Sequence, residues 1–234
     1  MQAGNLSGNI LITGGANGIG YAVAKRFSKE NYKVAIADIE KPQYEDENIF
    51  FSKADISNPK DIDSLYDDVI NAIGHPEILV LNAGRGIQEK LFEGDPEKWQ
   101  KVIDTNLMGA LRCIRAFVPQ MMERQNGHVI VVSSVSANQP HPSGGIYAAS
   151  KTALEVIAET LRLETLPHIK VTVVSPGITD TKFFEHQISG YTSVANLEMG
   201  SIAPEDIAED IFYAVNQKGR SINKIITRPL KQSF

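Results

Sequence analysis

The stretch that decides the fold is Thr13-Gly14-Gly15-Ala16-Asn17-Gly18-Ile19-Gly20, which joins an apolar run to an amphipathic segment. The apolar run, residues 9–13, predicts a strand, and residues 18–29 carry the 3.6-residue periodicity of a helix. Glycines at such a turn let backbone N–H groups approach a phosphate, which the positive end of the following helix stabilises. The motif therefore predicts a phosphate-binding turn, although a glycine-rich turn alone also suits a plain connection.

Segments of the same two kinds alternate along the rest of the chain. Apolar runs rich in Val and Ile predict strands at residues 9–13, 33–38, 49–54, 77–81, 128–133, 170–174 and 224–227. Amphipathic stretches predict helices at residues 18–29, 59–73, 96–124, 144–166 and 204–215. Most of the strands lack polar alternation, which indicates burial on both faces. The pattern predicts an α/β fold, with a doubly wound, seven-stranded parallel sheet flanked by helices on both faces.

Length, composition and charge narrow the class of protein. The 234 residues suit one large α/β unit, and no linker or repeat divides them, so we expect a single domain over residues 1–234. The polar, glycine-containing segment 179–201 is the least regular part and is expected to form a substrate loop. The 23 Lys plus Arg against 28 Asp plus Glu give a net charge of −5, which disfavours nucleic acid and anionic membranes as partners.

The cysteine and the histidines indicate the cellular compartment and whether a metal site is expected. The single cysteine, Cys113, cannot form an internal disulfide, and no signal-peptide pattern opens the chain. No run of about 18 consecutive apolar residues suggests a membrane span. We therefore expect a cytoplasmic protein. The five histidines show no metal-ligand spacing, so no metal site is expected.

Asp38 stands at the end of the second predicted strand, where a carboxylate can accept hydrogen bonds from an adenosine ribose. Its charge would repel a ribose 2′-phosphate, and neither Asn17 nor Ile39 offers a cation to hold one. These residues favour NAD over NADP as the cofactor. Lys41, the nearest basic residue, leaves NADP as the less favoured alternative.

A tyrosine and a lysine share one face of a predicted helix in Tyr147-Ala148-Ala149-Ser150-Lys151. The Lys ammonium can lower the phenol pKa from about 10 towards the working range of an acid or base. By itself such a pair is common on solvated helices. Here it follows a strand ending in Ser133-Ser134, where parallel sheets place ligands, and Ser134 could donate a hydrogen bond to a substrate oxygen.

These features make the chain resemble the short-chain dehydrogenase/reductase family in its compact form, a single NAD(P)-binding Rossmann-like domain. The resemblance covers nearly the whole chain. It rests on Thr13-Gly14-x-x-x-Gly18-x-Gly20, Asp55-Ile56, Asn82-Ala83-Gly84, Asn106, Ser134, Tyr147-x-x-x-Lys151 and Pro176-Gly177-Ile178-Thr179-Asp180-Thr181. Ser134 lies 13 residues before Tyr147, as in the family pattern, which selects it over Ser133 and Ser136.

The resemblance implies an NAD-dependent oxidoreductase that interconverts a secondary alcohol and a ketone. Tyr147 would be the general acid/base, and Lys151 would lower its pKa and bind the nicotinamide ribose. Ser134 would orient the substrate oxygen, while Asn106 would hold a water that links Lys151 to solvent. Hydride transfer itself belongs to the cofactor, and the protein supplies position and electrostatics.

The resemblance also implies a set of cofactor contacts. Ile178 and Thr181 would fix the nicotinamide carboxamide, Asp55 and Ile56 would meet the adenine, and Asn82-Ala83-Gly84 would support the sheet beside the cofactor. Asp55 could instead cap the helix near Pro59, and Asn82 and Asn106 could be structural. The full expected set is Gly14, Asn17, Gly18, Ile19, Gly20, Asp38, Ile39, Asp55, Ile56, Asn82, Ala83, Gly84, Tyr147, Lys151, Pro176, Gly177, Ile178 and Thr181.

The substrate side is less constrained by sequence. Ser134 and Tyr147 are expected to touch the substrate, and His141 either contacts it or faces solvent in a turn between prolines. Arg85 and Lys182 are the cationic candidates for a carboxylate or phosphate. The ending at residues 221–234 resembles the 3-hydroxy acid and serine dehydrogenase branch of the family. A small hydroxy acid, a polyol or a similar hydroxy compound is therefore the expected substrate.

Assembly and alternative functions complete the expectations. The helix at 96–124 is apolar on more than one face, so a homodimer or homotetramer packed through 96–124 and 144–166 is expected, as is common in the family. One alternative is a catalytically silent nucleotide-sensing protein, which the intact Ser, Tyr, Lys and Asn set disfavours. Another is a sugar-nucleotide epimerase or dehydratase, which would need a further substrate domain.

Overall fold

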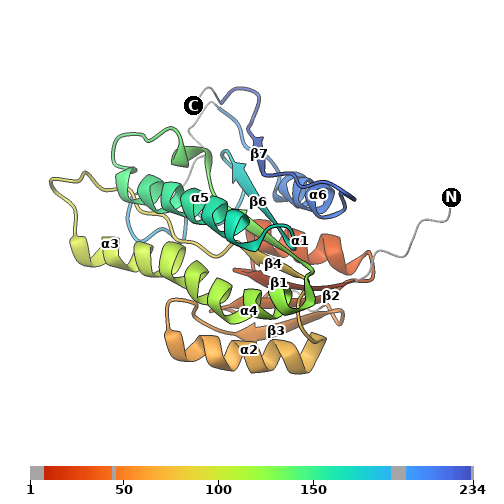
Figure 1. Ribbon diagram of the computed structural model, residues 1–234. Helices are drawn as coiled ribbons and strands as arrows, with labels where there is room; N and C mark the ends of the chain where they lie inside the picture. The colour runs from red at the N-terminus through yellow and green to blue at the C-terminus, as the bar shows by residue number, and fades with distance from the viewer. Residues whose placement is uncertain (1–7, 44–45, 191–198, 233–234) are drawn as a thin grey trace.

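The apolar runs form seven parallel strands of one sheet in the computed structural model, which describes residues 8–43, 46–190 and 199–232. The strand order is β3-β2-β1-β4-β5-β6-β7 (Figure 1), which confirms the predicted doubly wound sheet. The strands are β1 Asn9–Thr13, β2 Lys33–Asp38, β3 Ile49–Lys53, β4 Ile78–Leu81, β5 Gly127–Val132, β6 Ile169–Pro176 and β7 Lys224–Thr227.

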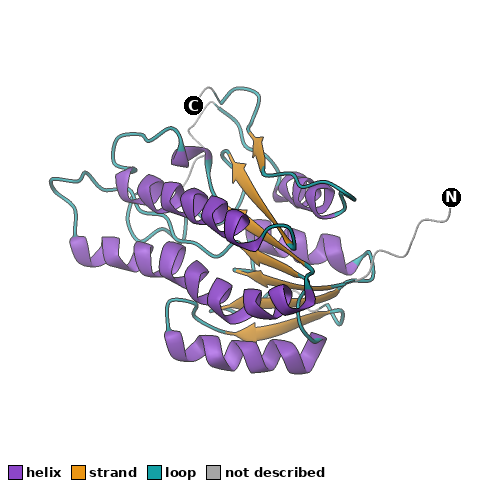
Figure 2. Cartoon of the chain, viewed as in Figure 1, coloured by secondary structure: helices purple, strands orange, loops and turns teal. Residues whose placement is uncertain are grey.

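Helices connect the strands and lie on both faces of the sheet (Figure 2). Asn58 and Asp95 each precede a helix that starts with proline, and each side chain accepts a hydrogen bond from a first-turn N–H. Asn58, and not Asp55, is therefore the cap before Pro59. The helices are α1 Gly18–Ser28, α2 Pro59–Ile73, α3 Pro96–Ile103, α4 Ala110–Arg124, α5 Gly145–Thr165 and α6 Pro204–Val215, with a 3₁₀ turn at Val135–Ala137.

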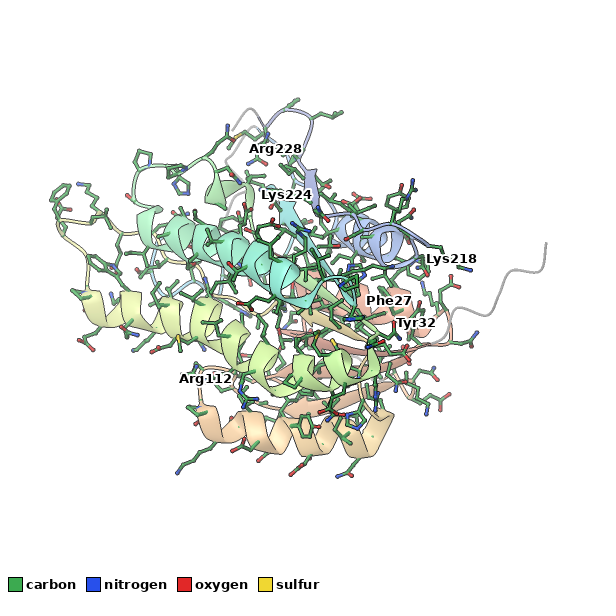
Figure 3. The ribbon with its side chains drawn as sticks, viewed as in Figure 1. Phe27, Tyr32, Arg112, Lys218, Lys224 and Arg228 are labelled. Carbon is green, nitrogen blue, oxygen red and sulfur yellow. The ribbon has the colours of Figure 1, made fainter. Side chains whose placement is uncertain are left out.

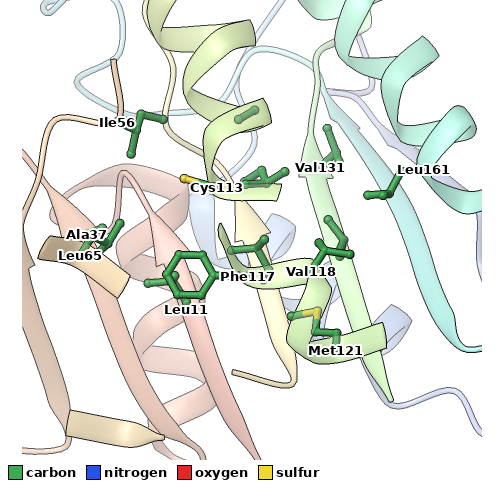
Figure 4. Close-up of a cluster of buried hydrophobic side chains, with 14 of the residues drawn as sticks. Leu11, Ala37, Ile56, Leu65, Cys113, Phe117, Val118, Met121, Val131 and Leu161 are labelled. Atoms are coloured by element: carbon green, nitrogen blue, oxygen red, sulfur yellow. The ribbon is translucent and has the colours of Figure 1, made fainter. Parts of the chain in front are cut away.

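Two apolar clusters bury the two faces of the sheet. One packs α2, α4 and α5 against the sheet, with Leu65, Phe117 and Met121 almost fully buried (Figure 4). The other packs α1 and α6 on the opposite face, where the Phe27 ring meets Tyr32 edge-on at 4.9 Å (Figure 3). Burial on both faces explains why the central strands read as continuous apolar runs.

Two features of the fold refine the predictions. The helix predicted at 96–124 is interrupted by a π-helical segment, Asp104–Gly109, whose wider turn sets the buried Asn106 towards the loop after β4. Burial on both faces, predicted for most strands, holds for the five inner strands, whereas β3 and β7 are partly exposed because they form the two edges of the sheet. Among the described helices, none is long and apolar enough to cross a membrane.

The strand order reverses between β1 and β4, which places a crevice at the carboxyl ends of these two strands. The buried Thr13 hydroxyl accepts the N–H groups of Asn82 and Ala83, both at 3.1 Å. In return, the Asn82 amide donates to the carbonyls of Thr13 and Gly14 at 3.0 and 2.9 Å. These bonds fix the two loops that form the floor of the crevice.

Candidate active site

The turn after β1 has the geometry that the glycine motif predicts. Gly14 and Gly18 adopt positive φ angles of 65° and 53°, which side chains rarely tolerate. A Cβ on Gly14 would lie 2.8 Å from the Ala83 Cα, and a Cβ on Gly20 would overlap the Gly14 carbonyl. Glycine at these two positions therefore lets the turn pack closely on the loop after β4 and on itself before it enters α1, whose N-terminus favours an anion.

A cavity of about 670 Å³ opens at the carboxyl ends of the strands. It runs from Asp38 after β2 to Tyr147 on α5, and so collects motifs that lie far apart in the sequence. Of the predicted site residues, Gly20 and Asn106 do not line it. Those that do are Gly14, Asn17, Gly18, Ile19, Asp38, Ile39, Asp55, Ile56, Asn82, Ala83, Gly84, Ser134, His141, Tyr147, Lys151, Pro176, Gly177, Ile178 and Thr181.

Carboxylates mark one end of the cavity. One oxygen of Asp38 accepts the Ala16 N–H at 2.9 Å and the other accepts the Glu40 N–H at 3.2 Å, so the carboxylate is oriented by its neighbours. Asp55 accepts the N–H and hydroxyl of Ser57, which holds the turn after β3. Both side chains are only half-buried and remain accessible from the cavity.

Ser134, Tyr147 and Lys151 meet at the other end, where β5 ends and α5 begins. Tyr147 shares a hydrogen bond with Ser134. The Lys151 Nζ donates to the Val132 carbonyl at 2.9 Å and lies 5.9 Å from the centre of the Tyr147 ring. Gly84 lies next to this Nζ, since a Cβ on Gly84 would be 3.4 Å from it, an ordinary van der Waals contact. The predicted trio is thus assembled in space.

Burial dominates the protonation of this trio. Desolvation raises the pKa of Tyr147 to about 12, against a smaller lowering by its hydrogen bond with Ser134. Desolvation also lowers the pKa of Lys151 to about 8. The groups that shift the Tyr147 pKa here do not include Lys151, so the lowering of that pKa by the lysine stays a prediction.

Asn106 stands behind the trio and does not line the cavity. Its Oδ1 accepts the Arg85 N–H at 2.7 Å, and its Nδ2 donates to the Arg85 carbonyl and the Ser150 hydroxyl, both at 3.0 Å. The side chain thereby joins the loop after β4 to helix α5. The water-holding role that the resemblance implies for Asn106 stays a prediction.

The segment after β6 corrects the expectation for Ile178. Its N–H donates to the Gln232 Oε1 at 3.0 Å and its carbonyl accepts the Ile202 N–H at 2.9 Å, so neither backbone group is free for a carboxamide. In extended chain, successive residues turn their backbone N–H and carbonyl groups to opposite sides. The next residue, Thr179, lines the cavity, and its N–H and carbonyl have no hydrogen-bond partner among the described residues.

Several lining residues were not singled out by sequence reasoning. Thr179 lies within the motif at 176–181 and Gln232 within the ending at 221–234, and the sequence alone assigns neither of them a role. The Phe183 ring lies 5.6 Å from the Tyr147 ring and forms an apolar wall. The adjacent aromatic pair at 183–184, inside the predicted substrate loop, was the available signal. Residues 191–198 of that loop lie outside the described residues.

Comparison with known proteins places this site in context. Residues 8–191 match the family model described as short chain dehydrogenase. An uncharacterized oxidoreductase of Staphylococcus haemolyticus is 32% identical, over 96% of this chain and 99% of that protein.

Solved structures agree with the family model. A serine dehydrogenase complexed with NADP+ superposes with a TM-score of 0.90 at 26% identity, covering 97% of this chain and 96% of that one. A 3-ketoacyl-(acyl-carrier-protein) reductase from Brucella melitensis, complexed with NADH, gives 0.86 at 25% identity, covering 96% and 98%.

The buried lysine makes stability depend on pH. Between its folded pKa of about 8 and its ordinary value of 10.5, the unfolded chain binds more protons, so the Lys151 contribution to stability rises with pH. We expect the free energy of unfolding of the wild type, minus that of Lys151→Met, to increase by about 2 kcal/mol from about pH 7.5 to about pH 10. Urea unfolding measures this difference.

The exposed Lys53 supplies the control, since Lys53→Met removes an ammonium group that is already solvated. For that variant the difference should be nearly the same at both pH values. An equally flat difference for Lys151→Met would contradict the desolvated state of the lysine.

Proposed function

Because the chain belongs to the short chain dehydrogenase family, we propose that it is an NAD-dependent oxidoreductase that interconverts a secondary alcohol and a ketone. The observation that carries the proposal is the convergence of Ser134, Tyr147 and Lys151 at one end of a cavity whose other end reaches Asp38. The glycine turn lines the cavity between these ends, at Gly14, Asn17, Gly18 and Ile19, where a dinucleotide pyrophosphate would lie.

The residues present fit a nicotinamide cofactor along the whole cavity. Asp38 would accept hydrogen bonds from the adenosine ribose, the glycine turn would bind the pyrophosphate, and Lys151 would bind the nicotinamide ribose. The N–H and carbonyl of Thr179, which have no partner among the described residues, suit the nicotinamide carboxamide, and the Thr181 side chain lies against Gly18. When bound, this cofactor supplies or accepts the hydride.

The chain itself would move the proton and hold the substrate. In reduction, the Tyr147 hydroxyl gives its proton to the substrate oxygen, while the Ser134 hydroxyl orients that oxygen by a hydrogen bond. In oxidation, Tyr147 takes the proton back. A protonated Lys151 would stabilise the tyrosinate that forms in between, which offsets part of the desolvation that raises the Tyr147 pKa.

Charge at the adenosine end supports NAD as the preferred cofactor. Asp38, Glu40 and Asp55 line this end of the cavity, whereas the lining cations of the described chain lie after β4, on α5 and after β6. A ribose 2′-phosphate would therefore meet carboxylates with no cation among the described residues that line this end, because Lys41 lines a separate hollow with Tyr21 and Phe51. The NADP+ bound to the related serine dehydrogenase makes NADP the alternative to test.

Charge at the other end supports a small hydroxy acid as the substrate. Arg85, His141, Lys182 and His186 also line the cavity. Its lining carboxylates among the described residues are Asp38, Glu40 and Asp55, which lie at or just after the ends of β2 and β3, at the adenosine end. Arg85 and Lys182 form no salt bridge with the residues that the structure describes. A substrate carboxylate would be attracted to these cations, and Phe183 and Phe184 limit its apolar bulk.

A homodimer or homotetramer through α5 and the preceding helices belongs to the same proposal. Val156 and Leu163 are 63% and 58% exposed, and their spacing places them on one face of α5. Met108, 38% exposed, lies in the π-helical segment that packs against α5. Exposed apolar side chains on neighbouring elements are typical of a subunit interface. The single, buried Cys113 is compatible with the cytoplasm as the proposed location.

Light scattering at micromolar concentration tests the assembly. The wild type should have the mass of two or four chains, and Leu163→Glu should shift it towards one chain. A monomeric wild type would contradict the proposed interface, whereas the exposed Leu230→Glu serves as the control that leaves the mass unchanged.

Removing the Tyr147 hydroxyl tests the proposed reaction. In a screen of ketones and hydroxy acids followed by NADH absorbance, Tyr147→Phe should lower kcat about 100-fold or more, because the proton donor is lost. NADH affinity should stay within about twofold, since the ring remains. Tyr213→Phe, an exposed tyrosine on α6, is the matched control. Turnover that survives in Tyr147→Phe would refute the assignment.

Removing the Asp38 charge tests the cofactor preference. Asp38→Asn keeps an oxygen for the Ala16 N–H but removes the repulsion of a 2′-phosphate. We expect the ratio of the NADPH to the NADH dissociation constant to fall by about tenfold. Asp63→Asn makes the same charge change on the exposed face of α2 and should leave the ratio unaltered. An unchanged ratio in Asp38→Asn would count against this account.

A further inference from the structure

The segment after β7 turns back onto the end of β6 and carries a buried polar side chain into the cavity. Gln232 is 8% exposed and lines the cavity beside Gly177 and Ile178. Its N–H donates to the Pro229 carbonyl at 2.9 Å, which forms the turn that points the side chain inward. Its Oε1 accepts the Ile178 N–H at 3.0 Å, across 54 residues of sequence.

Gly177 shows how closely this segment approaches β6. The Gly177 N–H donates to the Thr227 carbonyl at 2.7 Å. A Cβ at position 177 would overlap the Gln232 Oε1 and lie 2.9 Å from the Pro229 Cδ. Glycine therefore permits a contact that any side chain would push apart.

The same segment also touches the wall after β5. The Arg228 guanidinium donates to the Gln139 Oε1 at 3.1 Å, and Arg228 lies just beyond β7 (Figure 3). Gln139, which lies between Ser134 and Tyr147 in the sequence, also lines the cavity. Residues 227–232 thus contact both walls at the end of the cavity that holds the proposed proton donor.

The bond from Gln232 sets the direction of the peptide groups that follow. With the Ile178 N–H turned towards Gln232 and its carbonyl towards Ile202, the peptide groups of Thr179 face the other way. Thr179 is 6% exposed, and its hydroxyl donates to the Gly177 carbonyl at 3.1 Å, which fixes it further. Its backbone N–H and carbonyl are left for the cavity, without partners in the described part of the chain.

We propose that Gln232 is a positioning residue for the nicotinamide end of the cofactor, acting through Ile178 to present the Thr179 backbone to the carboxamide. This inference rests on the proposed function. Without the glutamine oxygen, the Ile178 N–H would lose its buried acceptor, and the segment would gain freedom to rotate towards other acceptors. The adenosine end, on the far side of the sheet reversal, shares none of these contacts.

Two ligands separate positioning from general stability. NADH carries the nicotinamide, whereas ADP-ribose carries only the adenosine, pyrophosphate and second ribose. We expect Gln232→Leu to weaken NADH binding about tenfold, on the scale of one partly buried hydrogen bond, and to change ADP-ribose binding less than about twofold. Titration calorimetry measures both. Gln217→Leu, which removes a surface glutamine amide, is the matched control for both ligands.

The outcomes distinguish a failure of the role proposed for Gln232 from a failure of the proposed function. Equal weakening of both ligands, or no weakening of NADH, overturns the role of Gln232. Wild-type protein that binds neither ligand overturns the proposed function itself. If Gln232→Leu does not fold, Gln232→Asn replaces it, because its oxygen is one methylene short of the Ile178 N–H, and the same selective loss is expected.

Discussion

The site depends on one constraint, the clamp between the ends of β1 and β4 where the sheet reverses its winding. The Thr13 hydroxyl holds the N–H groups of Asn82 and Ala83, and the Asn82 amide holds the carbonyls of Thr13 and Gly14. Loops that leave a reversal point in opposite directions open a crevice, and these bonds keep its floor fixed. The glycine turn can then remain bare of side chains without collapsing, because the clamp supplies the hydrogen bonds that the turn lacks.

Burial determines the protonation of the side chains at the end of the cavity that holds Tyr147 and Lys151. Desolvation in the cavity favours the neutral form of both groups, so it raises the pKa of the Tyr147 phenol and lowers the pKa of the Lys151 amine. A site of this kind holds its proton on the tyrosine until a partner of suitable charge lowers the cost of releasing it. Asn106, which does not line the cavity, joins the loop after β4 to α5 by hydrogen bonds. These bonds restrict the movement of the helix that carries Lys151.

Local signals made much of this predictable from sequence. The glycine turn, the apolar strands and the Tyr147–Lys151 spacing depend on residues close together in the chain, and the structure places them as predicted. The π-helical segment, the direction of the Ile178 peptide and the inward turn of Gln232 depend on partners far away in the sequence. In extended chain a shift of one residue reverses a backbone N–H, so only the pairing with Ile202 decides which residue faces the cavity.

A crystal structure of the protein with NAD+ would show how the cofactor lies along the cavity. We expect the adenosine ribose to contact the Asp38 carboxylate and the nicotinamide carboxamide to contact the Thr179 backbone. The nicotinamide ring would then lie beside the Tyr147 hydroxyl, and the Gln232 side chain would still accept the Ile178 N–H. A cofactor bound in the opposite direction, or with its nicotinamide away from Tyr147, would contradict this binding mode.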